Sequence, residues 1–161
     1  MSSRKPSRSA GLLLYREGEN GLEVLLGHPG GPFWARKDDG AWSIPKGEYD
    51  EGEDPWAAAQ REFAEEIGTP APTGPRLELP PVRQSGGKVV TAFAVRGDLD
   101  VSAAVSNTFT MEWPPRSGRM AEFPELDRVA WWDLETARVK LLKSQLPLLD
   151  ALIEAVVDGR D

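Results

Sequence analysis

Three glutamates, Glu62, Glu65 and Glu66, are spaced so that a single helix would carry them on one face. At about 100° per residue, positions i, i+3 and i+4 project within roughly a 100° arc. Like charges at these spacings repel by about 0.2 to 0.5 kcal/mol per pair, and no lysine lies between Asp54 and Gly68 to offset them. A solvated acidic face is the ordinary interpretation of a glutamate-rich helix. A bound divalent cation is the alternative that removes the repulsion.

The residue types of this cluster suit a metal ion that in turn binds a phosphate-containing substrate. The chain has no cysteine and one histidine, so a bound metal would rest mainly on oxygen ligands. Such ligands suit Mg²⁺ or Mn²⁺, and Mg²⁺ commonly bridges a few carboxylates to substrate phosphates. Arg61, next to Glu62, could pair with a carboxylate and hold it in register. Its alternative role is an ordinary surface salt bridge.

The acidity of the chain belongs to one segment. The net charge is −7, and residues 48–66 alone account for all of it, leaving the remainder neutral. This balance argues against general nucleic-acid binding, and no stable nucleic-acid partner is expected. No apolar run is long enough to span a membrane, and the N-terminus lacks the apolar stretch of a signal peptide, so we expect a cytoplasmic protein.

The length and the hydrophobic pattern predict one domain. We expect a disordered basic tail over residues 1–9, followed by a single domain over residues 10–161, compatible with a homodimer. The expected strands are 10–15 and 22–27, paired as a hairpin, and 42–44, 77–82, 88–95, 108–113 and 128–132. A terminal helix is expected over about 144–157. Several strands, interrupted by one central helix and followed by a terminal helix, indicate an α/β or α+β sandwich with a mixed sheet.

The central helix has clear boundaries in the sequence. Asp54 can accept hydrogen bonds from free backbone amides, and Pro55 fits the first helical turn. Gly68 predicts its end. Four apolar residues at spacings of 3, 4 and 4 mark the face turned to the core: Trp56, Ala59, Phe63 and Ile67.

A known motif joins this helix to the segment before it. Gly47, five residues, Glu53, seven residues and then Arg-Glu-Phe-Ala-Glu-Glu-Ile-Gly over residues 61–68 resembles the Nudix box, G-x5-E-x7-R-E-U-x-E-E-x-G-U, where U is a bulky apolar residue. Thr69 departs from the last U, a packing position. Residues 42–47, Trp-Ser-Ile-Pro-Lys-Gly, also resemble the usual approach to that box.

The resemblance implies a fold and a reaction. Nudix proteins are α/β/α sandwiches that use Mg²⁺ or Mn²⁺ to hydrolyse a nucleoside diphosphate linked to another moiety. Carried over by position, Glu62, Glu65 and Glu66 would bind the metal, together with the backbone carbonyl of Gly47. Glu53 would support the site or orient Arg61. The general base would be Glu65, Glu66 or a glutamate outside the box.

Other site residues are expected outside the box. Many Nudix members supply a further carboxylate before the strand that follows a substrate loop, which here would be Glu122 or Glu125, with Glu112 a weaker third. We expect residues 108–127 to form that loop. Candidate phosphate contacts are Arg36, Lys37, Lys46, Arg83, Lys88, Arg116 and Arg119, each of which is alternatively an ordinary surface residue. Candidate base-stacking rings are Trp34, Trp42 and Trp113, of which at least one is expected in the core instead. His28 is expected to be a loop residue rather than a catalytic base.

The pattern as a whole looks most like the branch that hydrolyses diadenosine polyphosphates and nucleoside triphosphates. We therefore expect a Mg²⁺-dependent pyrophosphohydrolase whose partner is a small nucleoside polyphosphate. Two alternatives stay open. One is a non-catalytic nucleotide-binding module on the same fold. The other is a diphosphoinositol polyphosphate hydrolase, whose highly charged substrate would require a denser cluster of basic residues than this chain carries.

Overall fold

The computed structural model describes residues 8–19 and 21–158. The expected tail lies mostly outside these residues, but Arg8 and Ser9 already belong to the first strand. The strands are β1 (Arg8–Gly18), β2 (Gly21–Pro29), β3 (Lys46–Glu48), β4 (Arg76–Glu78), β5 (Val82–Arg83), β6 (Val89–Arg96), β7 (Thr108–Glu112), β8 (Met120–Pro124) and β9 (Leu126–Asp133). The α-helices are α1 (Pro55–Ile67), α2 (Leu134–Lys140) and α3 (Leu146–Asp158), with short 3₁₀ turns at Ser85–Gly87, Val101–Ala103 and Lys143–Gln145.

A mixed sheet of seven strands forms the centre of the domain. Its main order is β4-β6-β1-β2-β9, with β3 paired to β1 and β5 paired to β6. β1 and β6 run parallel, whereas the other pairs are antiparallel. Residues 9–11 of β1 pair with β3, and residues 15–18 pair with β2, which confirms the expected hairpin. The short strand β3 is thereby held against the N-terminal half of β1.

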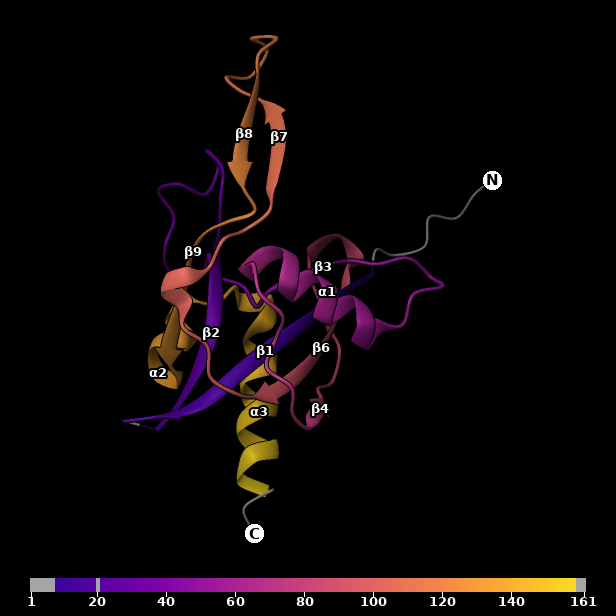
Figure 1. The fold of residues 1–161 in the computed structure, drawn as a ribbon, viewed down its shortest axis with the longest axis vertical. Coiled ribbons are helices and arrows are strands. Elements are labelled where there is room, and N and C mark those ends of the chain that lie inside the picture. Colours follow the sequence, from indigo (N-terminus) through magenta and orange to yellow (C-terminus); the bar gives the residue numbers. More distant parts are fainter. Residues whose placement is uncertain (1–7, 20, 159–161) are drawn as a thin grey trace.

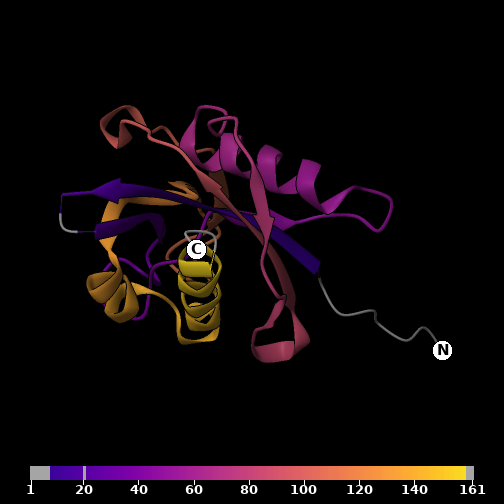
Figure 2. The same ribbon diagram turned by 90° about the horizontal axis from the view of Figure 1, so that it is seen from below.

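Helices cover both faces of the sheet, as Figures 1 and 2 show. Successive side chains of a strand point to opposite faces. Leu12 and Leu14 of β1 accordingly pack against α1, and Leu13 packs on the other face with residues of α2 and α3. The α/β/α sandwich with a mixed sheet is therefore confirmed.

Helix α1 begins and ends where its sequence predicts. The Asp54 side chain accepts a hydrogen bond from the Ala57 amide at 3.1 Å, and Pro55 is the first helical residue. Gly68 closes the helix at φ +90°, a left-handed conformation that glycine adopts readily. Phe63 and Ile67 are fully buried against the sheet, which fixes the rotation of the helix about its axis.

Several expected elements differ from the structure. The strand expected at 42–44 is wrong, because Trp42 and Ser43 make only isolated bridges and the strand beside them is β3. The strand expected at 77–82 is divided into β4 and β5, since two prolines at 80 and 81 cannot donate ladder hydrogen bonds. Helix α2 is additional to the expected elements. No helix in the described part of the chain is long and apolar enough to cross a membrane.

The segment expected to be a substrate loop is largely a β-hairpin. β7 and β8 pair as a separate two-stranded sheet, with Thr108 opposite Pro124 and Glu112 opposite Met120. Figure 1 shows this hairpin projecting from the body of the domain, beyond the end of β9. Only its tip, between residues 112 and 120, remains a loop.

Candidate active site

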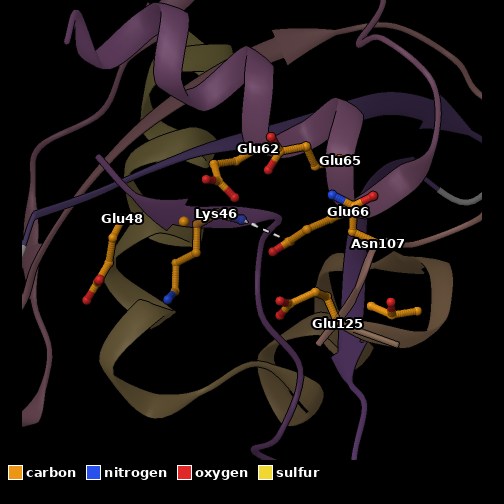
Figure 3. A pocket seen from close by; sticks show the side chains of 9 residues that line it. Lys46, Glu48, Glu62, Glu65, Glu66, Asn107 and Glu125 are labelled. Carbon is orange, nitrogen blue, oxygen red and sulfur yellow. Dashed lines mark hydrogen bonds between the residues drawn. The ribbon is translucent and has the colours of Figure 1, made fainter. Parts of the chain in front are cut away.

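A cavity of about 480 Å³ opens where the C-terminal half of α1 meets β3 and the root of the β7–β8 hairpin. Figure 3 shows how side chains from these elements meet there. The cavity is lined by Lys46, Gly47, Glu48, Glu62, Glu65, Glu66, Asn107, Thr108 and Glu125. The structure therefore brings together the three clustered glutamates and Gly47, as the sequence predicts.

Burial and mutual repulsion raise the pKa values of two α1 carboxylates, those of Glu62 and Glu66. Glu66 accepts a hydrogen bond from the Lys46 amide at 3.3 Å. Burial, with the nearby charge of Glu62, raises the pKa of Glu66 to about 8. Burial also raises the pKa of Glu62, and the charge of Glu65 adds to the effect. A positive charge in this cavity would favour the ionised forms of both carboxylates.

Gly47 allows β3 to lie directly against α1. A Cβ atom at this position would overlap the carboxylate group of Glu62. Glycine thus lets the Glu62 carboxylate lie directly against the strand backbone, and a larger residue would displace that carboxylate.

Arg61 lies at the centre of an acidic network on the outer side of the helix. Its Nε and Nη2 donate to the two carboxylate oxygens of Glu53 at 3.0 and 3.1 Å. Its Nη1 donates to Glu62 at 2.8 Å and lies 3.5 Å from Glu65. These carboxylates raise the pKa of the guanidinium. Glu53 is therefore placed to orient Arg61, which in turn holds Glu62 and Glu65.

The carboxylate that lines the cavity from outside the motif is that of Glu125. Its amide donates to the Asn107 carbonyl at 2.7 Å, and its own carbonyl accepts from the Gly30 amide at 3.0 Å. Glu122, which we expect as a metal ligand from sequence, instead lies in β8 opposite Thr110 and does not line the cavity. The cause is the hairpin register, which places Glu125, after the end of β8, beside α1.

Of the expected substrate-binding residues, only Lys46 lines the cavity. Burial lowers the pKa of its ammonium group, and Glu66 opposes this effect. Lys46 and Glu48 extend side by side away from Glu62 (Figure 3). Trp34 and Arg36 lie in the β2–β3 loop (residues 30–45), and Arg116 and Arg119 lie at the hairpin tip.

Trp42 and His28 have structural roles. Trp42 is buried in the core and packs edge-on against Trp132 at 5.3 Å. His28 lies in β2 rather than in a loop, and it is fully buried. Its Nδ1 is 2.7 Å from Asp127 Oδ1, and its Nε2 is 2.5 Å from the Lys37 carbonyl. Both ring nitrogens are therefore engaged in holding the β2–β3 loop to β9.

The groups that line the cavity are of the kinds that coordinate a divalent cation. It offers carboxylate oxygens and the Gly47 backbone, which hard cations prefer. In this conformation, however, no three acidic or histidine side chains among residues 8–19 and 21–158 converge tightly enough to form a complete cation site. Separate partners hold the carboxylates apart, since Glu62 pairs with Arg61 and Glu66 accepts from the Lys46 amide.

The chain is similar in sequence to a known protein family and to one characterised relative. Residues 5–152 match the NUDIX domain family. An RNA pyrophosphohydrolase of Rhodospirillum rubrum is 48% identical over 67 residues, a match covering 40% of this chain and 39% of that protein. The chain thus aligns with about two fifths of the length of this relative.

Solved structures share the fold. The NUDIX domain of Shewanella oneidensis NrtR, solved in complex with ADP ribose, superposes with a TM-score of 0.67 at 19% identity, covering 96% of this chain and 90% of that one. A Caenorhabditis elegans Ap4A hydrolase superposes with a TM-score of 0.60 at 21% identity, covering 94% and 98% of the two chains.

Proposed function

Since the chain belongs to the NUDIX family, we propose that it hydrolyses a phosphoanhydride bond of a nucleoside polyphosphate. The observation that carries this proposal is the convergence of the three α1 glutamates, Gly47 and Glu125 on one cavity. The names of two relatives, an RNA pyrophosphohydrolase and an Ap4A hydrolase, support the same class of reaction.

The proposed hydrolysis would use Mg²⁺, which Mn²⁺ could replace. Glu62, Glu65 and Glu66 would hold it, together with the backbone carbonyl of Gly47. When bound, such a cation neutralises phosphate charge and lowers the pKa of the attacking water. The raised pKa values of Glu62 and Glu66 support this assignment, because carboxylates crowded in this way are most stable beside a positive charge.

The remaining residues of the motif position these ligands. Arg61 holds the carboxylates of Glu62 and Glu65 on its guanidinium, and Glu53 fixes that guanidinium by a bidentate contact. A planar donor group is suited to this task because it fixes direction as well as charge. Lys46 donates its amide to Glu66 and presents its ammonium group at the cavity, where it would contact a substrate phosphate.

Glu125 is the group that we propose to accept the proton of the attacking water. Among the described residues, its carboxylate has no hydrogen-bond or ion-pair partner, whereas Glu62, Glu65 and Glu66 are each engaged. It lies beside Glu66 on the side of the cavity away from Glu62 and Glu65 (Figure 3). A carboxylate placed there can take a proton without leaving the ligand set.

A hydrolysis screen tests this function. Nucleoside triphosphates, dinucleoside polyphosphates, ADP-ribose and diphosphoinositol phosphates are incubated with Mg²⁺, and the products are identified by mass spectrometry. We expect turnover of nucleoside polyphosphates that disappears in Glu66→Gln. If nucleotides bind but stay intact, the chain is a binding module and the proposal is wrong. If only diphosphoinositol phosphates are cleaved, the reaction class holds but the substrate is different.

A further inference from the structure

A second cavity, of about 340 Å³, lies where β5 and β6 run beside the start of β1. Its lining residues come from four segments of the chain: Arg8, Tyr49, Pro81, Arg83, Val89 and Thr91. None of them lines the cavity of the α1 glutamates, which we call the acidic cavity. We call the second one the arginine cavity.

Strand pairing places two arginines of this cavity in one row across the sheet. Arg8 of β1 and Arg83 of β5 are both cross-strand partners of Val89 in β6, one on each side of it. Residues in such a row point to the same face, and neighbouring strands are about 4.8 Å apart, so roughly 10 Å separates the two arginine Cα atoms. Two long side chains at this spacing can close on a single bound group.

Two hydroxyl groups lie beside the arginines. The Tyr49 amide donates to the Arg8 carbonyl at 3.1 Å, which places Tyr49 next to Arg8 on the side away from Val89. Thr91 follows Val89 by two residues on β6 and therefore points to the same face. Among the residues that the structure describes, neither hydroxyl group has a hydrogen-bond partner. The cavity thus combines two hydroxyl groups with two guanidinium groups.

The positive charge of the arginine cavity is not compensated. Arg8 and Arg83 take part in no salt bridge within residues 8–19 and 21–158. Acids are nevertheless abundant nearby in the sequence, since four of residues 50–54, in the loop that leads to α1, are acidic. Other arginines of the chain do pair with acids: Arg16, Arg61, Arg128 and Arg138. An acidic chain therefore keeps two unpaired arginines in one cavity.

These donors suit a phosphate group better than a carboxylate. Each guanidinium can present two parallel N–H groups to an anion. Together with the two hydroxyl groups, the cavity offers about six donors, more than the roughly four acceptor positions of a carboxylate. A phosphate group has three strong acceptor oxygens and a larger charge.

The cavity also has room for an organic part of a ligand. Pro81 and Val89 add apolar surface beside the polar groups. The volume lies at the lower end of the range for small-molecule pockets, about 300 to 1,000 Å³. A phosphate group joined to a small carbon skeleton is therefore accommodated as well as a free phosphate ion.

We propose that the arginine cavity is a binding site for a phosphate group. Arg8 and Arg83 hold the phosphate from two sides, and the hydroxyl groups of Tyr49 and Thr91 donate to its remaining oxygens. The site is separate from the proposed active site, because Tyr49 lines the arginine cavity whereas Glu48, the residue before it, lines the acidic cavity. The inference does not rest on the proposed hydrolysis.

A titration without turnover tests this site. Inorganic phosphate and ribose 5-phosphate are added separately to ¹⁵N-labelled protein in EDTA at constant ionic strength, and backbone amide signals are followed by NMR. Without a cation, the glutamates of the acidic cavity repel phosphate. We expect saturable shifts centred on the amides of Arg8, Arg83 and Val89. Tighter binding of the ester would identify a phosphorylated small molecule as the ligand, and tighter binding of inorganic phosphate would identify the free ion.

Substitutions in the cavity should weaken binding in a graded way. Arg8→Gln and Arg83→Gln should each weaken it by about 10- to 100-fold, the effect of losing hydrogen bonds to a charged group. Tyr49→Phe and Thr91→Val remove only a hydroxyl group and should each weaken it by about 2- to 10-fold. Thermal unfolding checks that each variant is folded.

Matched controls separate a defined site from general positive charge. Lys88→Gln removes a cation next to Val89 whose side chain points to the opposite face of the sheet, near Lys46. Arg96→Gln removes an exposed arginine at the other end of β6. Each control should change the affinity by less than about threefold, because charges at this distance are screened.

Three results would overturn the proposal. The first is the absence of saturable binding by the wild type. The second is a loss of affinity in Lys88→Gln or Lys46→Gln as large as that in Arg83→Gln, because phosphate would then bind by net charge or in the acidic cavity. The third is tighter binding of acetate than of phosphate, which would show a carboxylate site. Failure of the chain to hydrolyse any nucleotide would refute the proposed function and leave this site standing.

Discussion

Gly47 of β3 lies so close to Glu62 of α1 that no side chain fits between them. The strand backbone therefore faces the Glu62 carboxylate directly, and Gly47 lines the same cavity. Glu62 is also held from the outer side by Arg61 at 2.8 Å. The motif glycine and the motif arginine thus place one carboxylate from two directions.

This relationship predicts a large effect for Gly47→Ala. The added methyl group must displace the Glu62 carboxylate, so we expect kcat/KM to fall by about 100-fold or more. Because this carboxylate is the far end of a flexible side chain, stability should change by less than about 1 kcal/mol. Gly52→Ala is the matched control, because a Cβ atom at that position meets no other atom within 4 Å. Steady-state kinetics and denaturant unfolding measure the two effects. Near wild-type kinetics for Gly47→Ala would show that this close contact is unimportant.

Glu125 and Glu122 provide a comparison of two nearby glutamates. Glu125 lines the cavity, while Glu122 lies on the hairpin outside it. Glu125→Gln should lower kcat by about 100-fold, within the range for loss of a general base, and Glu122→Gln should change it less than about twofold. Separate measurement of kcat and KM distinguishes a proton acceptor from a substrate-binding residue, since loss of the acceptor should lower kcat and leave KM nearly unchanged. The reverse pattern would restore the sequence-based assignment of Glu122.

Arg61 and Glu53 should behave as a coupled pair. Their bidentate contact implies that Glu53→Gln and Arg61→Lys each lower kcat/KM by about tenfold, and that the double variant loses little more than either single one. A double-mutant cycle on kcat/KM measures this coupling. Additive losses would mean that Glu53 does not act through Arg61.

The raised pKa of Glu66 predicts a pH dependence of stability in metal-free buffer. Its folded-state pKa of about 8 exceeds the ordinary value of 4.5, so the folded chain holds this proton more tightly than the unfolded chain does. Its stabilising contribution is complete below about pH 4.5 and declines as the pH rises towards 8. Thermal unfolding in EDTA from pH 5 to pH 9 should show Tm falling by several degrees more in the wild type than in Glu66→Gln.

Mg²⁺ should reverse this loss. At pH 9 the added cation should raise Tm of the wild type, because it binds the ionised carboxylates of the folded state. Glu154→Gln, an exposed site on α3, serves as the control and should follow the wild type in both buffers. A Tm of the wild type that is flat with pH would contradict the assigned burial of Glu66.

The helix and its acidic face could be predicted because their signals are local. Asp54, Pro55 and Gly68 define the ends of α1, and the spacing of Glu62, Glu65 and Glu66 places them on one face. These features depend on residues within one or two turns of each other. The ends of the helix and its acidic face can therefore be predicted without knowledge of the tertiary structure, although packing on the sheet stabilises the helix.

The remainder of the site depends on pairing between distant segments. Glu125 reaches the cavity because of the β7–β8 register and because of hydrogen bonds to Asn107 and Gly30. β8 has weak alternation and follows a tip rich in proline and glycine, so the segment resembles a loop in sequence. His28 likewise resembles a loop residue in sequence, because its contacts with Asp127 and with the Lys37 carbonyl join segments that are distant along the chain or irregular.

The most direct test of the central claim is to measure cation binding and turnover in the same samples. Mn²⁺ is titrated into the wild type and into a Glu65→Gln/Glu66→Gln double variant, with bound metal followed by electron paramagnetic resonance and hydrolysis of a nucleoside polyphosphate followed in parallel. We predict that the wild type binds Mn²⁺ and turns over in proportion to the bound metal, and that the folded double variant loses both. Turnover near the wild-type rate in the double variant would contradict the assignment of this cavity as the metal-dependent active site.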